Sequence, residues 1–394
     1  MVAPADRSPL ASRLAGIPPT VFSEMSALAV RTGAVNLGQG FPDVDGPSSV
    51  VERAVRALRE GANQYAPGIG VPALRQAVAR HQQRHHGIEL DPDTEVCVTT
   101  GATEGIAAAL LGLVDPGDEV VVLEPSYDSY DAMIAMTGGV RRGVTLRAPD
   151  FRLDGDALRA AVTARTRLVL LNSPHNPTGT VLTREELQLV ADVAIEHDLT
   201  VVTDEVYEHL VFDGRSHVPL AALPGMRERT LTLSSVGKSW SFTGWKVGWA
   251  TGPAPLVAAV LATKQWLTFT SGSPLQPAVA HALDHEADWP LELARDLQGR
   301  RDLLLEGLRS LGLSPRTSEG TYFTVTDVEH LGWEDGRAFS LGVAERAGVV
   351  PIPLQGFYSE DPAAGRHLVR WAFCKTPDVI TEGIDRLSRA DLAR

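Results

Sequence analysis

Apolar residues recur at helical spacing in the first third of the chain and then in short β-rich runs. Positions three and four residues apart predict helices over Ser48–Arg59 and Val71–His86, the second of which ends at a glycine. Helical patterns over residues 103–114 and 183–197 separate the runs that follow, and Thr183 with Glu186 forms a capping box at the start of the second. The predicted strands are Val96–Thr99, Val120–Leu123, Leu168–Leu171, Thr200–Thr203 and Thr230–Leu233. Strands that are apolar throughout and alternate with helices favour a mostly parallel sheet covered on both faces.

After about Ala280 the pattern changes to a mixture of helices and separated strands. The expected elements are a long helix at Leu291–Leu311, a strand at Thr321–Val325, a helix at Arg337–Ala347, strands at Val349–Ile352 and Leu368–Phe373, and a last helix after Pro377. We therefore expect an α/β fold with a large domain over residues 46–283 and a smaller α+β domain over residues 284–394. An N-terminal arm, residues 1–45, is expected to join the small domain.

Composition narrows the class of protein. A chain of 394 residues is long enough for two domains, and its net charge of −13 argues against nucleic acid or an anionic membrane as the main partner. No stretch approaches the ~18–20 apolar residues needed to span a bilayer, and the N-terminus lacks the apolar core of a signal peptide. Cys97 and Cys374, the two cysteines, lie in apolar runs that predict buried, reduced thiols. The expected compartment is the cytoplasm.

A lysine framed by small residues follows the last predicted strand of the large sheet. The segment Ser234–Lys238 ends a strand in hydroxylated residues and then offers an amine, and Lys246 stands eight residues later. A lysine forms a Schiff base with an aldehyde when burial lowers the pKa of its amine. A second cation nearby favours the neutral amine and can also bind a phosphate. Two surface lysines would give the same pattern, so this segment alone leaves both interpretations open.

Two other strand ends carry polar side chains. The loop after the strand at 168–171 contains Asn176, whose amide can donate to a phenolate oxygen, and His175, to which we assign no role. Asp204 ends the strand at 200–203, at the edge where parallel sheets bind ligands, and a buried carboxylate there needs a cation such as a protonated pyridine nitrogen. Tyr207 could reach the oxygen of the same ring. A plain turn and a helix-capping aspartate are the structural alternatives.

Three further features fit a phosphorylated, planar cofactor and a carboxylate substrate. The segment Thr100–Gly105 joins a strand to a helix, and its small residues expose backbone N–H groups that suit a single phosphate. It lacks G-x-G-x-x-G, which disfavours a dinucleotide site and with it a nicotinamide dehydrogenase. Tyr127 could lay its aromatic face on a planar cofactor. Arg370 lies inside an apolar strand, where its planar fork fits either a carboxylate or a structural ion pair.

In order and spacing these residues resemble the fold-type I enzymes of the class I/II aminotransferase family, nearly end to end. The segments Asn36–Asp43 and Asn63–Tyr65 look like the branch of kynurenine, glutamine and methionine aminotransferases, and the actinobacterial N-succinyldiaminopimelate aminotransferases look equally close. The resemblance implies pyridoxal 5'-phosphate (PLP) as the cofactor, a homodimer with shared active sites, and no metal. It also implies a ping-pong transfer of an amino group from an L-amino acid to a 2-oxo acid such as 2-oxoglutarate.

The resemblance also implies a role for each site residue. Lys238 binds PLP covalently and then moves the substrate proton, while Asp204 keeps the pyridine nitrogen protonated. Asn176 and Tyr207 bond the phenolic oxygen of the ring, and Tyr127 stacks on the ring. The phosphate ligands implied are Gly101, Ala102, Thr103, Ser235, Lys246 and the partner's Tyr65. The substrate-binding residues implied are Gly40, Asn176 and Arg370 for the α-carboxylate, with Phe22, Phe269 and Thr270 in the side-chain pocket, together with Tyr322 and Phe357.

The sequence departs from the family pattern at two positions. Lys246 stands where many relatives have arginine, and Thr270 stands where the kynurenine-type pocket commonly has histidine, which puts a preference for bulky aromatic donors in doubt. We expect a donor with a neutral or long polar side chain, or N-succinyl-LL-diaminopimelate, rather than aspartate. The alternatives are a PLP-dependent β-lyase, which would use the same residues, and a PLP-binding regulator without turnover.

Overall fold

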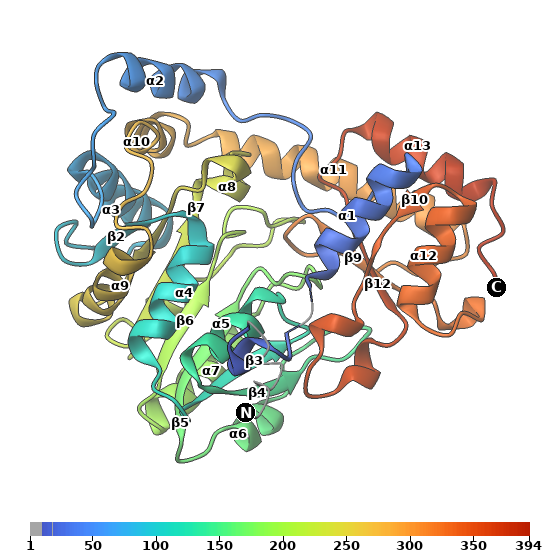
Figure 1. Cartoon of the computed structure of the whole chain (residues 1–394), viewed down its shortest axis with the longest axis horizontal. Coiled ribbons are helices and arrows are strands. Elements are labelled where there is room, and N and C mark those ends of the chain that lie inside the picture. The colour runs from blue at the N-terminus through green and yellow to red at the C-terminus, as the bar shows by residue number, and fades with distance from the viewer. Residues whose placement is uncertain (1–9, 18) are drawn as a thin grey trace, which may run out of the picture.

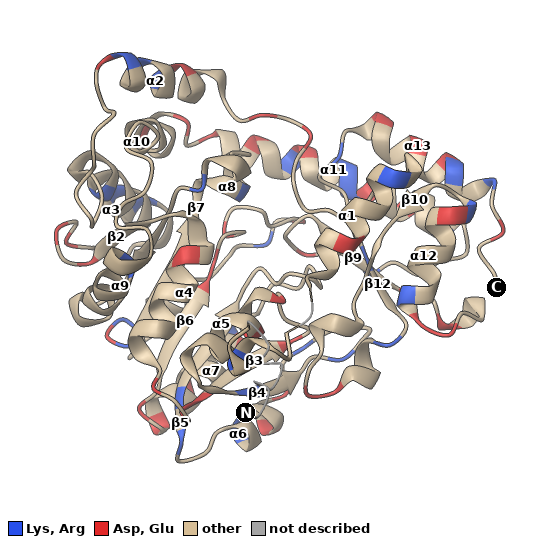
Figure 2. Cartoon of the chain, in the orientation of Figure 1, with Lys and Arg blue, Asp and Glu red and all other residues tan. Residues whose placement is uncertain are grey.

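A computed structural model of the protein describes residues 10–17 and 19–394 (Figure 1). Residues 1–9 and 18 of the predicted N-terminal arm lie outside the described residues. The described part of the chain forms one seven-stranded sheet and two smaller sheets. Charged residues concentrate on the outer helices and the loops (Figure 2). No helix in the described ranges is long and apolar enough to cross a membrane.

The seven-stranded sheet has the strand order β2-β8-β7-β6-β5-β3-β4. Its strands are β2 (Val96–Thr99), β3 (Glu119–Glu124), β4 (Val140–Thr145), β5 (Thr166–Asn172), β6 (Thr200–Asp204), β7 (Thr230–Ser235) and β8 (Gly248–Thr251). All adjacent pairs are parallel except those of β8, which runs antiparallel to β2 and to β7. This confirms the predicted α/β fold with a mostly parallel sheet.

Helices cover both faces of this sheet because alternate strand residues point to opposite sides. In β3, Val120 and Val122 pack into a core with α4, α5 and α9, while Val121 and Leu123 pack into another with α7. The helices of this part are α2 (Ser48–Arg59), α3 (Pro72–His86), α4 (Gly101–Leu113), α5 (Ser129–Thr137), α6 (Gly155–Ala161), α7 (Arg184–Glu196), α8 (Val236–Ser239), α9 (Ala254–Leu267) and α10 (Gln276–His285). The capping box of Thr183 and Glu186 is present at the start of α7, as predicted.

The C-terminal third packs around a three-stranded antiparallel sheet of order β11-β12-β9. Its elements are α11 (Trp289–Ser310), β9 (Phe323–Asp327), α12 (Gly336–Arg346), β10 (Val349–Val350), β11 (Ile352–Pro353), β12 (Leu368–Ala372) and α13 (Pro377–Ser388). The N-terminal segment joins this part, since α1 (Val21–Thr32) contacts α12 and β1 (Val35–Asn36) pairs with β10. The domain boundaries at residues 45 and 283 stay a prediction.

Two predicted strands differ in detail from the structure. The run Val349–Ile352 forms two strands rather than one, because Pro351 has no N–H and the strands on its two sides pair in different sheets. The strand predicted at Thr321–Val325 begins only at Phe323, because Thr321 has a left-handed backbone with φ of 66°. Short 3-10 turns connect several elements: Ser12–Leu14, Leu220–Ala222, Thr243–Trp245, Glu329–Leu331, Gln355–Phe357 and Pro362–Gly365.

Candidate active site

A cavity of ≈ 390 Å³ lies where the C-terminal ends of β5, β6 and β7 meet the N-terminus of α4 and the sheet of the C-terminal third. Its volume falls within the roughly 300–1,000 Å³ typical of small-molecule sites. Parallel strands place their C-terminal ends at one edge of the sheet, which is where α/β folds bind ligands. The sequence-predicted residues that line it are Phe22, Gly40, Gly101, Ala102, Thr103, Tyr127, Asn176, Asp204, Tyr207, Ser235, Lys238, Lys246 and Arg370.

Lys238 enters the cavity from the four-residue helix α8, which begins directly after β7. Its Nζ lies 3.5 Å from the carbonyl oxygen of Gly40, at the outer limit of a hydrogen bond, and 5.7 Å from the ring centroid of Tyr322. Burial lowers the pKa of Lys238 to about 8, and the positive charge of Lys246 acts in the same direction. The amine is therefore partly neutral near physiological pH, where an ordinary lysine is almost fully protonated, and a nucleophile and proton carrier needs such a neutral fraction.

Asp204 lies at the end of β6 and is 6% exposed. Its Oδ2 accepts a hydrogen bond of 2.7 Å from the hydroxyl of Tyr130, and its Oδ1 accepts one of 3.3 Å from the backbone N–H of Val206. Burial raises the pKa of Asp204 even though these bonds favour its ionised form. Within the described residues it has no salt bridge to a cation. Since this carboxylate faces the cavity, a protonated ring nitrogen bound there would supply the missing counter-charge.

The part of the cavity at the N-terminus of α4 suits an anion. Gly101 opens α4 with φ of 70°, a left-handed conformation that favours glycine. The first-turn N–H groups of a helix have no intrahelical acceptor, so those of Ala102 and Thr103 are available to a phosphate. Lys246 brings its Nζ to within 3.4 Å of the hydroxyl of Thr103, and a Cβ at Gly101 would lie 3.2 Å from that same Nζ.

Arg370 lies on β12 and is 1% exposed. Its Nη1 donates to Oδ1 of Asn176 over 2.8 Å and its Nη2 to the carbonyl of Gly38 over 2.7 Å, while Nε has no hydrogen-bond partner in the described structure. The guanidinium lies 3.8 Å from the ring centroid of Phe323. Burial lowers its pKa to about 10. Since none of the salt bridges of the described chain involves Arg370, it is a fixed, buried cation that a substrate carboxylate can pair with.

Three predicted site residues lie away from the cavity of their own chain. Tyr65 is 84% exposed and packs edge-on against Phe269, with ring centroids 5.3 Å apart. Phe269 is 49% exposed, and Thr270 follows it outside the cavity lining. Two other predicted residues, Tyr322 and Phe357, contact residues that line the cavity. Tyr322 donates to the Gly40 carbonyl over 2.6 Å, and Phe357 packs edge-on against Phe22 at 5.7 Å.

Sequence reasoning missed Tyr130 and Asn172, both of which line the cavity. Tyr130 lies at the start of α5, three residues after Tyr127, which precedes the helix, and the two rings pack edge-on at 5.6 Å. Its closeness in sequence to Tyr127 was the signal available for Tyr130. Asn172, at the end of β5, donates to the Asp204 carbonyl over 2.8 Å and accepts from the backbone N–H of Asn176, so it fixes the loop between them.

The cavity complements each chemical group of PLP. Its anion end suits the phosphate, the buried carboxylate of Asp204 suits the pyridine nitrogen, and the Lys238 amine suits the aldehyde. Tyr127 presents an aromatic ring at the cavity wall, half-buried and 5.6 Å from the ring of Tyr130. The residues present therefore fit this cofactor.

The chain is similar to known proteins over most of its length. The chain matches the model of the family described as aminotransferase class I and II over residues 32–387. It is 53% identical to the probable N-succinyldiaminopimelate aminotransferase of Mycobacterium tuberculosis, covering 96% of this chain and 97% of that one. It is 40% identical to the methionine aminotransferase of Escherichia coli, covering 95% and 97%. The solved structure of the M. tuberculosis N-succinyldiaminopimelate aminotransferase matches with a TM-score of 0.94, at 52% identity over 98% of this chain and 100% of that chain.

Proposed function

Since the chain belongs to the class I and II aminotransferase family, we propose N-succinyl-LL-diaminopimelate as its amino donor and 2-oxoglutarate as the acceptor. Enzymes of this family depend on PLP, and this one transfers amino groups between amino acids and 2-oxo acids. The relative with 53% identity carries the name of an aminotransferase for this compound. Donors with neutral side chains, such as methionine and glutamine, are the second candidates, since a methionine aminotransferase is 40% identical.

The small number of cationic side chains at the cavity favours this choice of donor. The described residues that line it include three, Lys238, Lys246 and Arg370, and each has a task. Lys238 binds the aldehyde, Lys246 the phosphate and Arg370 the α-carboxylate. None is left to pair with the second carboxylate of a short donor such as aspartate. A donor whose second carboxylate lies far from the reacting carbon avoids this cost of burying an unpaired charge.

Each residue has a defined part in the transfer. PLP supplies an electron sink that stabilises the negative charge left at the substrate Cα when its proton departs. Lys238 would hold the cofactor through its Nζ. With the amino donor bound, this Nζ would accept the proton from the substrate Cα and supply one in return, a task suited to an amine whose pKa is about 8. Asp204 would maintain the positive charge on the ring nitrogen, which would increase the acidity of the Cα proton.

Other residues orient the reactants. Arg370, held by Asn176 and Gly38, fixes the α-carboxylate and with it the direction of the Cα–H bond. Asn176 and Tyr207 would bond the phenolic oxygen of the cofactor, and Tyr127 would stack on its ring. The residues that would bind the phosphate are Gly101, Ala102, Thr103, Ser235 and Lys246.

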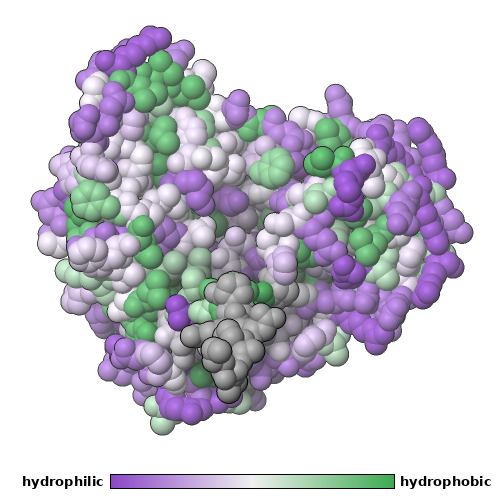
Figure 3. Space-filling model, viewed as in Figure 1, coloured by the Kyte–Doolittle hydropathy of each residue, from purple (hydrophilic) through white to green (hydrophobic). Residues whose placement is uncertain are grey.

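The homodimer belongs to the same proposal, with the partner's Tyr65 completing the phosphate site and the partner's Phe269 and Thr270 bordering the side-chain pocket. The support is a group of exposed aromatic residues, since Tyr65 is 84%, Trp266 82% and Phe269 49% exposed. The exposed side of α2, with Val51, Val55 and Leu58, adds a further apolar area, at the upper left in Figure 3. Cytoplasmic location is proposed because both cysteines are free, buried thiols.

The test is a panel of amino donors with 2-oxoglutarate, read as glutamate formed. It should include N-succinyl-LL-diaminopimelate, methionine, glutamine, kynurenine and aspartate. We expect the largest kcat/KM for the succinylated donor and the smallest for aspartate. A kcat/KM for aspartate above the others would contradict the cation argument, while comparable values for methionine and glutamine alone would transfer the assignment to neutral donors.

A further inference from the structure

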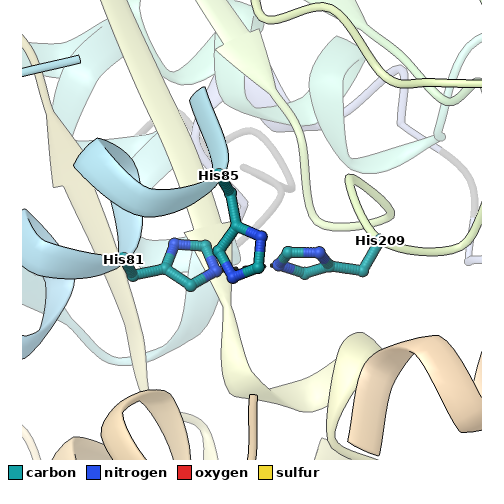
Figure 4. Close-up of side chains that lie close together, drawn as sticks. All are labelled: His81, His85 and His209. Carbon is teal, nitrogen blue, oxygen red and sulfur yellow. Dashed lines mark hydrogen bonds between the residues drawn. The ribbon is translucent and has the colours of Figure 1, made fainter. Parts of the chain in front are cut away.

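Outside the active-site cavity, three histidines converge from two elements of the chain (Figure 4). His81 and His85 lie four residues apart on α3, so they stand on one side of that helix. His209 lies in the segment that follows β6. The Nε2 atoms of His81 and His209 are 2.8 Å apart, and one nitrogen from each of the three rings lies within 4.8 Å of the others. Figure 4 shows the ring of His85 pointing between the other two.

The state of these side chains suits metal binding. His81 is fully buried and His209 is 9% exposed. Their Nε2 atoms lie 2.8 Å apart, so at least one of the two rings is neutral, because a ring nitrogen that carries a proton cannot accept a hydrogen bond. The neutral imidazole is the form that binds a metal ion. The direct contact of the two rings also leaves Nδ1 of His81 buried and without a hydrogen-bond partner in the described structure.

A buried negative charge lies beside the three rings. Glu208 is 3% exposed and accepts hydrogen bonds from Nε2 of His86 over 2.7 Å and from the hydroxyl of Ser234 over 2.5 Å. A fixed carboxylate that is not itself a ligand lowers the cost of placing a cation in this partly buried position.

We propose that His81, His85 and His209 form a Zn²⁺ site, with three imidazole ligands and the fourth position open to water. Tetrahedral zinc with Zn–N distances of about 2.0–2.1 Å separates its nitrogen ligands by about 3.4 Å. The His81 and His209 nitrogens therefore need to separate by about 0.6 Å. His85 is exposed, and its ring centroid already lies 4.7 Å from that of His81 and 4.8 Å from that of His209.

The site would connect a segment that contributes residues to the active-site cavity with a helix that contributes none. His209 follows Asp204 and Tyr207 in the same segment, whereas α3 contributes nothing to the cavity lining. A zinc ion bound to both would hold this segment against α3. Its effect on the reaction would be positional, since none of the three histidines lines the active-site cavity.

The chain offers a matched control for the test. His281 and His285 form a second pair four residues apart on α10, with ring centroids 4.7 Å apart, the same separation as His81 and His85. Of the described residues, no third metal-binding side chain joins that pair. His285 is exposed like His85, so His85→Gln and His285→Gln are equivalent changes at sites with and without the third histidine.

Untagged holoenzyme should be dialysed against a chelator and then against buffered Zn²⁺, and its zinc content and thermal unfolding measured. We expect about one zinc per chain in the wild type and in His285→Gln, with a higher Tm when zinc is present. His85→Gln should lose most of the bound zinc and the Tm increase, and His209→Asn should do the same. Zinc bound by PLP or by the α10 pair would remain in His85→Gln. If this variant bound as much zinc as the wild type, the ion would be held outside the three-histidine cluster and the proposal would be overturned. Absence of stoichiometric zinc from the wild type would also overturn it.

Discussion

Tyr130 donates its phenolic hydrogen to Oδ2 of Asp204 over 2.7 Å, and the two side chains are 2% and 6% exposed. Tyr130 belongs to α5 and Asp204 ends β6, so the bond joins a helix on one face of the sheet to the catalytic edge. Burial raises the pKa of Asp204, and this bond is the largest influence in the opposite direction. Tyr130 is thus a positioning residue that helps to keep the carboxylate ionised.

Tyr130→Phe should raise the pKa of Asp204 and weaken its hold on the ring nitrogen. A hydrogen bond to a charged group contributes ~1.5 kcal/mol or more, so we expect kcat/KM to fall at least about tenfold and PLP to dissociate more readily. Steady-state kinetics and PLP titration of the apoenzyme measure both. Tyr358→Phe is the control, because its hydroxyl bonds the Leu146 carbonyl outside the cavity. Equal PLP affinity in the two variants would contradict the role of Tyr130.

The pH dependence of PLP uptake should report the pKa of Lys238. Burial lowers this pKa to about 8, so the apoenzyme amine is mostly protonated below pH 8 and mostly neutral above it. Since the neutral amine attacks the aldehyde, the rate of uptake should rise with pH through a midpoint near 8. Stopped-flow absorbance after mixing apoenzyme with PLP measures it. Lys246→Ala should move the midpoint upward, because a neighbouring positive charge is removed. A midpoint near 10 in the wild type would show that the amine is solvated.

Lys238→Ala should abolish transamination without unfolding the chain. Loss of a positioned general acid and base alone costs about 10²–10⁴-fold, and loss of covalent attachment adds to it. The phosphate residues should still bind PLP, but borohydride should no longer fix the cofactor to the protein. Mass spectrometry of borohydride-treated samples is the measurement. In the control Lys246→Ala, the label should still appear on Lys238 although PLP binds less tightly. Normal turnover by Lys238→Ala would refute the assignment of the nucleophile.

Asp204→Asn should reduce kcat/KM about 10²–10³-fold, equivalent to ~3–4 kcal/mol, because a preorganised charge is removed from the ring nitrogen. Folding should be little affected, since the amide has nearly the same shape as the carboxylate. Asp213→Asn is the comparison, because Asp213 pairs with Arg301 away from the cavity. A loss smaller than about tenfold in Asp204→Asn would identify Asp204 as a structural residue.

Arg370→Lys should weaken every donor by a similar factor. Lysine cannot bond Asn176 and Gly38 together and still present a planar fork to a carboxylate, so kcat/KM should fall about tenfold to a hundredfold. Because the α-carboxylate is common to all donors, their rank order should not change. Arg301→Lys serves as the buried-arginine control, since Arg301 pairs with Asp213. A donor-dependent effect of Arg370→Lys would mean that Arg370 reads the side chain instead.

Hydrophobic patterning predicted five strands of the seven-stranded sheet well because their residues are mostly buried. The strand predicted at Val96–Thr99 is β2 without a change of bounds, and the catalytic edge follows from where such strands end. Patterning failed for β4 and β8. Of these, β4 is an edge strand in which two arginines interrupt the apolar run, and β8 is only four residues long. The direction of β8 depends on its neighbours and cannot be obtained from its own residues.

Side-chain pairs across the fold were harder to predict than motif residues. Lys238 and Asp204 lie in recognisable strand-end segments, but the bond between Tyr130 and Asp204 depends on how α5 packs on the sheet. The histidine cluster is similar. The spacing of His81 and His85 is visible in the sequence, yet His209 lies 128 residues from His81, and only the packing of two elements brings it near.

The segment from α1 to Gly40 lines the cavity with Phe22, Gln39 and Gly40 but holds none of the groups assigned to proton transfer or cofactor binding. Phe22 and Gly40, two of the residues proposed to contact the donor, are therefore encoded in a different stretch of the gene from Lys238 and Asp204. Substitutions at and around Phe22 can alter the choice of donor while Lys238 and Asp204 are preserved. An enzyme arranged in this way can acquire new substrates in few mutational steps, because selection on specificity does not act against the residues that provide the rate.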